Sequence, residues 1–418
     1  MPQAIHIDDL AAPRLSEVQA GALAWGETVT VDFSEHAILD AARQRTGLSD
    51  FGPEDFRERL RVLREAWDGD PEITRFHRTV LHGYLGRYAG NRLLIQDALK
   101  RHPAILNERI ERPLIVVGLP RSGTTHMVNL LAADRRLHSL PLWESYEPVP
   151  LPGEPAPGDE TDPRFRRCAE AWAGMQQATP LIASMHPMNP EHIHEELELM
   201  GPDFASYNFE WLGLTPRWRD HYFAHDQTPH YEYMKNVLRL LQWRRGEQKR
   251  WVLKCPQHLE QLPVLMKTFP DATVIFTHRD PVAVLQSTVT MQAYTQRMNR
   301  RHVALRALID YWSDRIERLL RACVRDRDLV PATRSLDSPF HVFMADQMGT
   351  MERVYATAGL ELEAPARGQL MRYVADHPRG KEGQVIYDLR RDFGVDPAAL
   401  HERFRFYFDR FPVKAEVR

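Results

Sequence analysis

Apolar side chains recur every three or four positions through much of the first 110 residues. In the segment PEDFRERLRVLREAW, Phe56, Leu60, Leu63 and Trp67 follow this spacing, with a proline and acidic residues at its start. The pattern continues through ITRFHRTVLHGYLGRYAGNRLLIQDALKRHP and stops at its last residue, a proline. Such a period is typical of amphipathic helices. It predicts an α-helical N-terminal extension over residues 1–111.

Short apolar runs replace this period after residue 111. Three of them, in PLIVVGL, RWVLK and DATVIFTH, are rich in β-branched or large apolar residues, and each is followed by a helical pattern. Continuous apolar runs are typical of strands buried on both faces of a parallel sheet. Strand followed by helix, repeated along the chain, predicts a doubly wound α/β fold flanked by helices. We expect this domain to span residues 112–418.

A long segment, at about residues 150–245, separates the first two of these units. It begins as the proline-rich PVPLPGEPAPGDETDP, typical of a loop, and continues as the aromatic-rich FASYNFEWLGLTPRWRDHYF. A helical insertion that covers an acceptor pocket explains this composition, and so does a helical cap with an ordinary apolar core. After residue 302 the pattern is mostly helical, with one strand predicted at FHVFMAD, residues 340–346.

Composition and charge narrow the class of protein. The chain has 418 residues, 27% of them charged, and a formal net charge of −3, which offers no electrostatic basis for binding nucleic acid or an anionic membrane. No signal pattern is visible, no apolar run approaches the roughly 20 residues that span a bilayer, and three cysteines are unclustered. We expect a cytoplasmic bacterial protein with reduced thiols and no transmembrane segment.

The loop GLPRSGTT joins the first apolar run to its helix. Gly118 and Gly123 let the backbone approach an anion, and the N–H groups at the start of the helix attract negative charge. An ATP-hydrolysing P-loop has Gly-Lys-Ser/Thr where this chain has Gly123-Thr124-Thr125. Arg121 supplies a cation from the other side of the glycine. The loop therefore indicates an anion site that needs no magnesium.

The third strand–helix unit carries a second anion-binding pattern. Its strand ends at His278-Arg279-Asp280, and Ser287 lies two turns into the next helix. Because parallel strands share one carboxyl edge, we expect Arg279 and Ser287 to lie near the first loop. The only carboxylate there follows two groups that can be cationic, which favours an anionic ligand without metal. Two separate phosphate sites indicate a nucleotide with phosphates at both ends.

These motifs resemble those of the PAPS-dependent sulfotransferases, in particular the larger bacterial members. The residues that carry the resemblance are PRSGTT after a strand and THRDPVAVLQS downstream. TGLSDFGPEDFRERLRVL, HPMNPEHIHEELELM and RWVLKCPQHLEQLPVLMKTFPDA extend it nearly end to end. The resemblance implies a P-loop-like fold and the donor 3′-phosphoadenosine 5′-phosphosulfate (PAPS), with PAP as product. It also implies sulfuryl transfer to a hydroxyl of a small-molecule or lipid-like acceptor.

The resemblance also implies which residues contact the nucleotide. The phosphate loop would hold the 5′-phosphosulfate, the Arg–Ser pair after the third strand would hold the 3′-phosphate, and HPRGKEGQVIYDLRRDFGV would add a third stretch. For that stretch, an exposed basic turn is the alternative interpretation. The implied residues are Arg121, Ser122, Gly123, Thr124, Thr125, Arg279, Ser287, Arg379, Gly380 and Lys381.

Sulfuryl transfer needs a base for the acceptor proton and a cation beside the departing oxygen. Glu144, in LPLWESYEPVP, is the first candidate for the base, since tyrosylprotein-type and bacterial glycolipid-type sulfotransferases place a glutamate similarly. A structural carboxylate is the alternative there. His258 is the rival base, although its spacing from Lys254 is longer than in the cytosolic enzymes. Lys254 and Arg121 are the candidate cations.

The histidine-rich HPMNPEHIHEELELM raises the possibility of a metal site. We predict that a helix begins there after Pro190, and adjacent side chains on a helix do not converge on one ion. No metal is therefore expected. His186 and Glu195 are assigned instead to the lining of the acceptor pocket.

Two other classes of protein fit parts of the pattern. A P-loop nucleotide kinase or NTPase would have the missing lysine and a metal-binding carboxylate. A non-catalytic nucleotide-binding module would keep the phosphate sites while Glu144 and His258 would be dispensable. Neither the acceptor nor the oligomeric state follows from the sequence.

Overall fold

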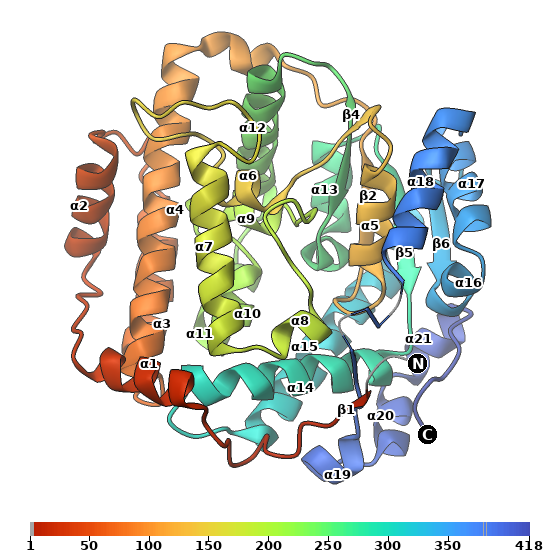
Figure 1. The fold of residues 1–418 in the computed structure, drawn as a ribbon. Coiled ribbons are helices and arrows are strands. Elements are labelled where there is room, and N and C mark those ends of the chain that lie inside the picture. The colour runs from red at the N-terminus through yellow and green to blue at the C-terminus, as the bar shows by residue number, and fades with distance from the viewer. Residues whose placement is uncertain (1–3, 379, 382) are drawn as a thin grey trace.

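The structure is a computed structural model that describes residues 4–378, 380–381 and 383–418. At its centre lies a five-stranded parallel sheet with the strand order β3–β4–β2–β5–β6, and helices cover both of its faces (Figure 1). This arrangement confirms the predicted doubly wound α/β fold. The strands are β2 (Leu114–Gly118), β3 (Leu137–His138), β4 (Arg250–Lys254), β5 (Thr273–His278) and β6 (Ser335–Pro339).

The central strands are buried on both faces, as their apolar runs predict. Every residue of β2 and β5 is buried. Leu114 and Val116 share one core with the helix that follows β2, whereas Ile115 and Val117 belong to the larger core on the opposite face. Alternate strand residues point to opposite faces, so each needs an apolar layer on its own side.

The N-terminal part is mainly helical, and it shares its core with the segment between β3 and β4. Leu60 and Trp67 pack in one apolar cluster with Phe209 and Trp218. Two short strands, β1 (Ala4–Ile5) and β7 (Gln384–Val385), pair in parallel and join the two ends of the chain. The N-terminal helices are α1 (Glu17–Glu27), α2 (Glu35–Thr46), α3 (Phe56–Asp68), α4 (Arg75–Arg101) and η1 (Pro103–Asn107).

The segment between β3 and β4 is also helical, apart from its proline-rich beginning. The helix predicted after Pro190 is wrong, because the backbone there pairs with residues 140–143 instead. Leu142 N donates to His192 O at 2.8 Å, and His194 N donates to Leu140 O at 2.8 Å. The helices are α6 (Leu142–Tyr146), α7 (Pro163–Ala178), α8 (Ile182–Met185), α9 (Leu197–Met200), η2 (Gly201–Asp203), α10 (Asn208–Leu212), α11 (Pro216–Phe223) and α12 (Thr228–Arg245).

The other helices follow the strands of the sheet. The phosphate loop leads into α5 (Thr124–Ala132), close to the prediction, and β4 and β5 are each followed by helical turns as expected. These elements are η3 (Pro256–Glu260), α13 (Leu262–Thr268), α14 (Pro281–Asn299), α15 (Leu305–Asp326), η4 (Arg327–Leu329) and η5 (Ala332–Arg334). None of the helices in the described ranges is long and apolar enough to cross a membrane.

The strand predicted at FHVFMAD is wrong. Residues 340–345 form α16 (Phe340–Ala345), and the edge strand β6 lies just before them, paired with β5 from Val274↔Ser335 to His278↔Pro339. Of the residues in α16, only Phe343 is buried, which a helix on the edge of the sheet explains. The remaining helices are α17 (Gln347–Ala358), α18 (Ala364–Asp376), α19 (Leu389–Phe393), α20 (Pro397–Arg403) and α21 (Arg405–Arg410).

Candidate active site

The loop between β2 and α5 is shaped to accept an anion. A Cβ at Gly118 would lie 1.9 Å from the Thr277 Oγ1, so only glycine fits there. Gly123 has a φ of +87° and is the N-cap of α5, and no side chain of the described residues caps this helix end. The first backbone N–H groups of a helix lack intrahelical partners. Those of α5 are therefore available to a negatively charged ligand.

The hydroxyl groups of the loop have different roles. Ser122 Oγ donates to Leu119 O at 2.6 Å and lies 2.7 Å from Thr277 Oγ1, so it closes the loop from inside. Thr125 Oγ1 lies 3.4 Å from Nζ of Lys254, at the end of β4. The structure thus places Thr125 on the ligand side of the loop and Ser122 on its inner side.

The two anion-binding patterns of the sequence meet in the structure. Arg121 Nε donates to Ser287 Oγ at 3.0 Å, and Arg279 Nη1 donates to the Arg121 carbonyl at 2.7 Å. Arg121 has a φ of +65°, which is unfavourable for a residue with a side chain and is often found at functional sites. Burial lowers the pKa of the Arg121 guanidinium, a destabilisation that a bound anion would relieve.

A carboxylate from the C-terminal end of the chain binds Arg279. Arg279 Nε and Nη2 each donate to the Glu416 carboxylate at 2.8 Å. The N–H groups of Glu416 and Val417 donate to the Asp280 carboxylate at 2.7 and 3.2 Å, which fixes this end of the chain beside β5. An arginine fork binds a carboxylate or a phosphate in the same bidentate manner. Glu416 thus presents negative charge where the resemblance implies a 3′-phosphate.

The third predicted stretch approaches the loop through a different residue. Arg379 lies outside the described residues. Gly380, with a φ of +80°, and the exposed Lys381 form a turn before β7. Beyond this turn, Tyr387 interacts with the guanidinium of Arg121 and partly offsets the lowering of its pKa. Tyr387 is not among the residues that the resemblance implies.

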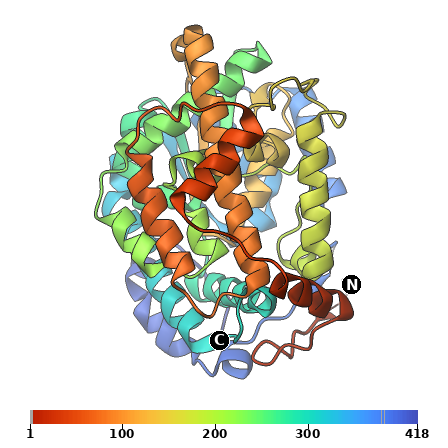
Figure 2. The ribbon, with the colours of Figure 1, turned by 90° about the vertical axis from the view of Figure 1, so that its left-hand side faces the viewer.

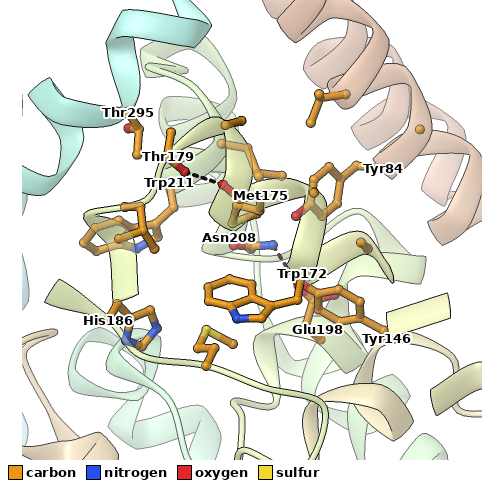
Figure 3. Close-up of a pocket in the computed structure, with 18 of the residues that line it drawn as sticks. Tyr84, Tyr146, Trp172, Met175, Thr179, His186, Glu198, Asn208, Trp211 and Thr295 are labelled. Atoms are coloured by element: carbon orange, nitrogen blue, oxygen red, sulfur yellow. Dashed lines mark hydrogen bonds between the residues drawn. The ribbon is translucent and has the colours of Figure 1, made fainter. Parts of the chain in front are cut away.

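A cavity of about 850 Å³ opens beside the phosphate loop. The loop and Glu195 line one end of it, and its walls come from α1, α4, α7, α8, α10 and α14. Figure 3 shows Trp172, Tyr146, His186 and Trp211 arranged around the open centre. Large cavities with mainly apolar and aromatic walls suit apolar ligands.

Charges in the cavity wall neutralise one another. Arg87 Nη2 donates to Glu198 at 2.9 Å, and Asn208 Nδ2 donates to the same carboxylate at 3.0 Å (Figure 3). The Arg87 guanidinium also lies 4.2 Å from the centroid of the Tyr146 ring. The paired charges leave the wall without a free ionic group at this place.

Glu195 and Lys254 form an ion pair where the cavity meets the phosphate loop. Lys254 is the last residue of β4 and is almost fully buried, and its Nζ also faces Thr125. Burial raises the pKa of Glu195, and Lys254 opposes this effect. A carboxylate and a cation thus lie together beside the loop, at the edge of the cavity.

The histidines of the same segment are neutral. Burial lowers the pKa values of His186, His192 and His194 well below their usual range, and nearby cations add to this effect. His186 and His194 line the cavity. Among the described residues, no group of three or more histidine, cysteine or acidic side chains is arranged to hold a metal ion.

The structure does not bring Glu144 or His258 to the cavity. Glu144 pairs with Arg245, whose guanidinium lies 4.7 Å from the Trp251 ring, and it is not among the described residues that line the cavity. His258 is fully buried, with Nδ1 2.8 Å from the Tyr231 hydroxyl. Its Nε2 lies 3.1 Å from a carboxylate oxygen of Glu196. Both residues are thus held by contacts with other side chains, away from the described lining of the cavity.

Comparison with known proteins identifies the family. Residues 113–364 match the sulfotransferase family. The chain belongs to this family. This sulfotransferase is 24% identical over 366 residues to omega-hydroxy-beta-dihydromenaquinone-9 sulfotransferase Stf3 of Mycobacterium bovis, covering 82% of this chain and 88% of the relative.

Two solved structures share the fold of this sulfotransferase. Sulfotransferase STF9 from Mycobacterium avium superposes with a TM-score of 0.83 and 26% identity, covering 93% of this chain and 100% of the other. For sulfotransferase STF1 from Mycobacterium tuberculosis H37Rv the TM-score is 0.77 and the identity 29%, over 89% and 98% of the two chains. The chain is thus a transferase of this fold over nearly its whole length.

Proposed function

We propose that this sulfotransferase transfers the sulfuryl group of PAPS to a hydroxyl group of an apolar, lipid-like acceptor. The observation that supports this most directly is the position of the Glu195–Lys254 pair. It stands between the open N-terminus of α5 and the end of an apolar cavity of about 850 Å³. Anion-binding groups and a base therefore meet where an acceptor hydroxyl can enter.

The residues around the loop fit the donor. The N-terminus of α5, Thr125 and Lys254 would hold its 5′-phosphosulfate, and Arg279 with Ser287 would hold its 3′-phosphate. When bound, PAPS supplies the sulfuryl group and a phosphate leaving group. The cations beside the loop stabilise the negative charge that develops there during transfer.

Glu195 is the base in this proposal. Its carboxylate lines the cavity next to the loop, so an acceptor hydroxyl can reach both. The raised pKa brings the carboxylate closer to the range in which a general base is effective. Lys254 orients Glu195 through their ion pair. In this proposal Glu195 takes the role for which the sequence suggested Glu144 or His258.

The acceptor is proposed from the cavity and from the relatives. The volume and the aromatic walls suit a long apolar chain, and the paired charges of Arg87 and Glu198 offer no site for an ionic substrate. The curated relative from Mycobacterium bovis is named for a menaquinone acceptor, a lipid-like molecule. An isoprenoid or other long-chain alcohol is the corresponding class.

Thermal unfolding tests the nucleotide site. PAP at about 100 times its dissociation constant should stabilise the wild type by roughly 2.7 kcal/mol. The Arg279→Ala variant should lose most of this shift, whereas Arg405→Ala, which removes an exposed arginine paired with Glu402, should keep it. Stabilisation by ATP and magnesium but not by PAP would contradict the proposal and favour a kinase or NTPase.

Product analysis by mass spectrometry in the same preparations tests transfer itself. With PAPS present, long-chain alcohols should be sulfated in preference to short polar ones, because only the former fill the cavity. Binding of PAP without transfer to any alcohol in a panel of graded chain length would favour a non-catalytic module.

A further inference from the structure

Helix α1 turns an apolar surface to the solvent. Between its terminal glutamates the sequence VQAGALAWG has one polar residue, Gln19, and that residue is buried. Val18 and Trp25 are 56% and 53% exposed, and Leu15, just before the helix, is 41% exposed. Surface helices of globular proteins normally present a polar face to water. The exposed side of α1 is instead suited to an apolar partner.

Specific contacts hold α1 in this orientation. A Cβ at Gly26 would lie 2.5 Å from the backbone N of Phe76, so the helix packs against α4 as closely as glycine allows. Gln19 Nε2 donates to Ala178 O at the end of α7, at 2.8 Å. Ser16 and Gln19 form a reciprocal capping box at the start of the helix. The apolar side therefore faces outward because the inner side is already docked.

The exposed face of α1 is continuous with the cavity. Val18 and Ala22 of α1 line the cavity, as does Met175 of α7, which is 37% exposed. The Trp25 ring packs edge-on against Phe76, another residue of the cavity wall. Figure 2 shows α1 lying across one end of α7. An apolar surface thus runs without interruption from the solvent into the cavity.

Two arginines near this face are paired with carboxylates. Arg14 binds Asp8, and Arg75 lies 3.4 Å from the Glu27 carboxylate. These arginines therefore give α1 no excess of positive charge, which a polyanion or an anionic surface would need for binding. The large apolar residues exposed elsewhere in the described chain stand singly, on η1, η4 and α18. Hydrophobic burial is the interaction that this face offers.

We propose that Leu15, Val18, Trp25 and Met175 form a lipid-docking face, which seats the enzyme on a bilayer with the mouth of the cavity against the acyl chains. The inference rests on the lipid-like acceptor of the proposed function. Transfer of such an acceptor from a membrane into water is unfavourable. When the mouth of the cavity is docked on the membrane, the acceptor can enter the cavity without passing through water. Tryptophan is well suited to the interface between water and lipid. A protein bound to the same face would close this entry.

Vesicle flotation tests the docking face. Wild-type protein should float with phosphatidylcholine vesicles at both low and high salt, because the interaction is apolar. A Val18→Asp/Trp25→Asp variant should bind about tenfold or more weakly. Leu329→Asp is the matched control, since Leu329 is 55% exposed on η4, and it should bind like the wild type. Quenching of Trp25 by brominated acyl chains, absent in Trp25→Phe, should report direct contact.

Three outcomes would overturn the inference. The wild type could stay in the lipid-free fractions, or the double variant could float as well as the wild type. Third, the wild type could form a dimer and not bind vesicles, while the double variant is a monomer; this result would assign the face to a second copy of the chain. Thermal stabilisation by PAP in the same proteins separates this from the proposed function, because loss of docking leaves that response intact. The retained response also shows that the variants fold.

Discussion

Glu195 and Glu196 are adjacent in the chain and lie in different environments. Glu196 is fully buried, accepts from the Lys254 backbone N–H at 2.7 Å and pairs with His258. Glu195 faces the cavity and binds the side chain of the same lysine. One carboxylate thus helps to fix the end of β4, and its neighbour faces the cavity. At the residue scale, position relative to the loop separates the proposed base from a structural acid.

Replacement of Glu195 by glutamine should separate catalysis from nucleotide binding. Glu195→Gln keeps the size of the side chain and removes the proton acceptor, so kcat should fall by about 10²- to 10⁴-fold. Stabilisation by PAP should be retained or increased, because Lys254 loses its carboxylate partner and stays beside the loop. Glu144→Gln is the matched control and should keep most of the activity. Loss of activity in Glu144→Gln with an active Glu195→Gln would restore Glu144 as the base.

The pH profile supplies an independent measurement on the same variants. A general base acts in its ionised form, and burial raises the pKa of Glu195 above the usual range for a glutamate. Wild-type kcat/KM should therefore fall as the pH drops through this raised pKa, at a higher pH than an exposed glutamate would give. The Glu195→Gln variant should lack this limb of the profile.

At the scale of elements, the C-terminal segment bears on the nucleotide site. Two of its backbone N–H groups donate to Asp280, and its Glu416 carboxylate binds the guanidinium of Arg279. The donor's 3′-phosphate would need the same guanidinium. The segment is thus positioned to compete with the nucleotide through one side chain while its backbone stays in place.

Removal of this charge should tighten nucleotide binding. Glu416→Gln abolishes the ion pair with Arg279, and a partly exposed pair of this kind predicts about a two- to fivefold lower Kd for PAP. Calorimetry on the purified protein measures the change. Glu402→Gln, at an exposed glutamate paired with Arg405, should leave the Kd unaltered. Weaker binding in Glu416→Gln would show that the carboxylate orients Arg279 for the nucleotide.

At the scale of the whole molecule, a buried ionic network joins parts of the chain that are distant in sequence. Arg315 of α15 is fully buried, and its Nε donates to Glu210 of α10 at 2.8 Å. Its two Nη groups donate to Glu260 of η3 at 2.6 and 2.7 Å. The insertion, the turn after β4 and the C-terminal half are therefore held together at one point.

The network should be needed for stability. Glu260→Ala leaves the buried Arg315 without one of its two carboxylates, and loss of a buried partner costs about 3–5 kcal/mol of unfolding free energy. Urea unfolding measures the loss. Glu402→Ala breaks an exposed pair and should cost about 1 kcal/mol or less. A similar small loss in both variants would contradict a central role for Arg315.

Local patterns predict much of this molecule. Mainly apolar runs predict β2, β4 and β5, because strands buried on both faces have few polar positions. The proximity of Arg279 and Ser287 to the phosphate loop is also predictable, since Arg279 follows β5 directly, Ser287 lies in the next helix, and parallel strands end at one edge. The strand prediction at FHVFMAD was wrong because a short apolar run shows no periodicity that distinguishes a strand from a helix.

The positions of the proposed base and of the cavity walls depend on contacts between distant parts of the chain. The residues after Pro190 look helical in sequence, but the backbone of residues 190–194 pairs with residues 140–143, and Glu195 next to this pairing lines the cavity. Glu416 meets Arg279 across 137 positions, a proximity that no local pattern encodes. The sequence by itself determined the three central strands, the phosphate loop and the family, because these follow from neighbouring residues. The tertiary structure alone decided which carboxylate reaches the cavity, because long-range packing sets that position.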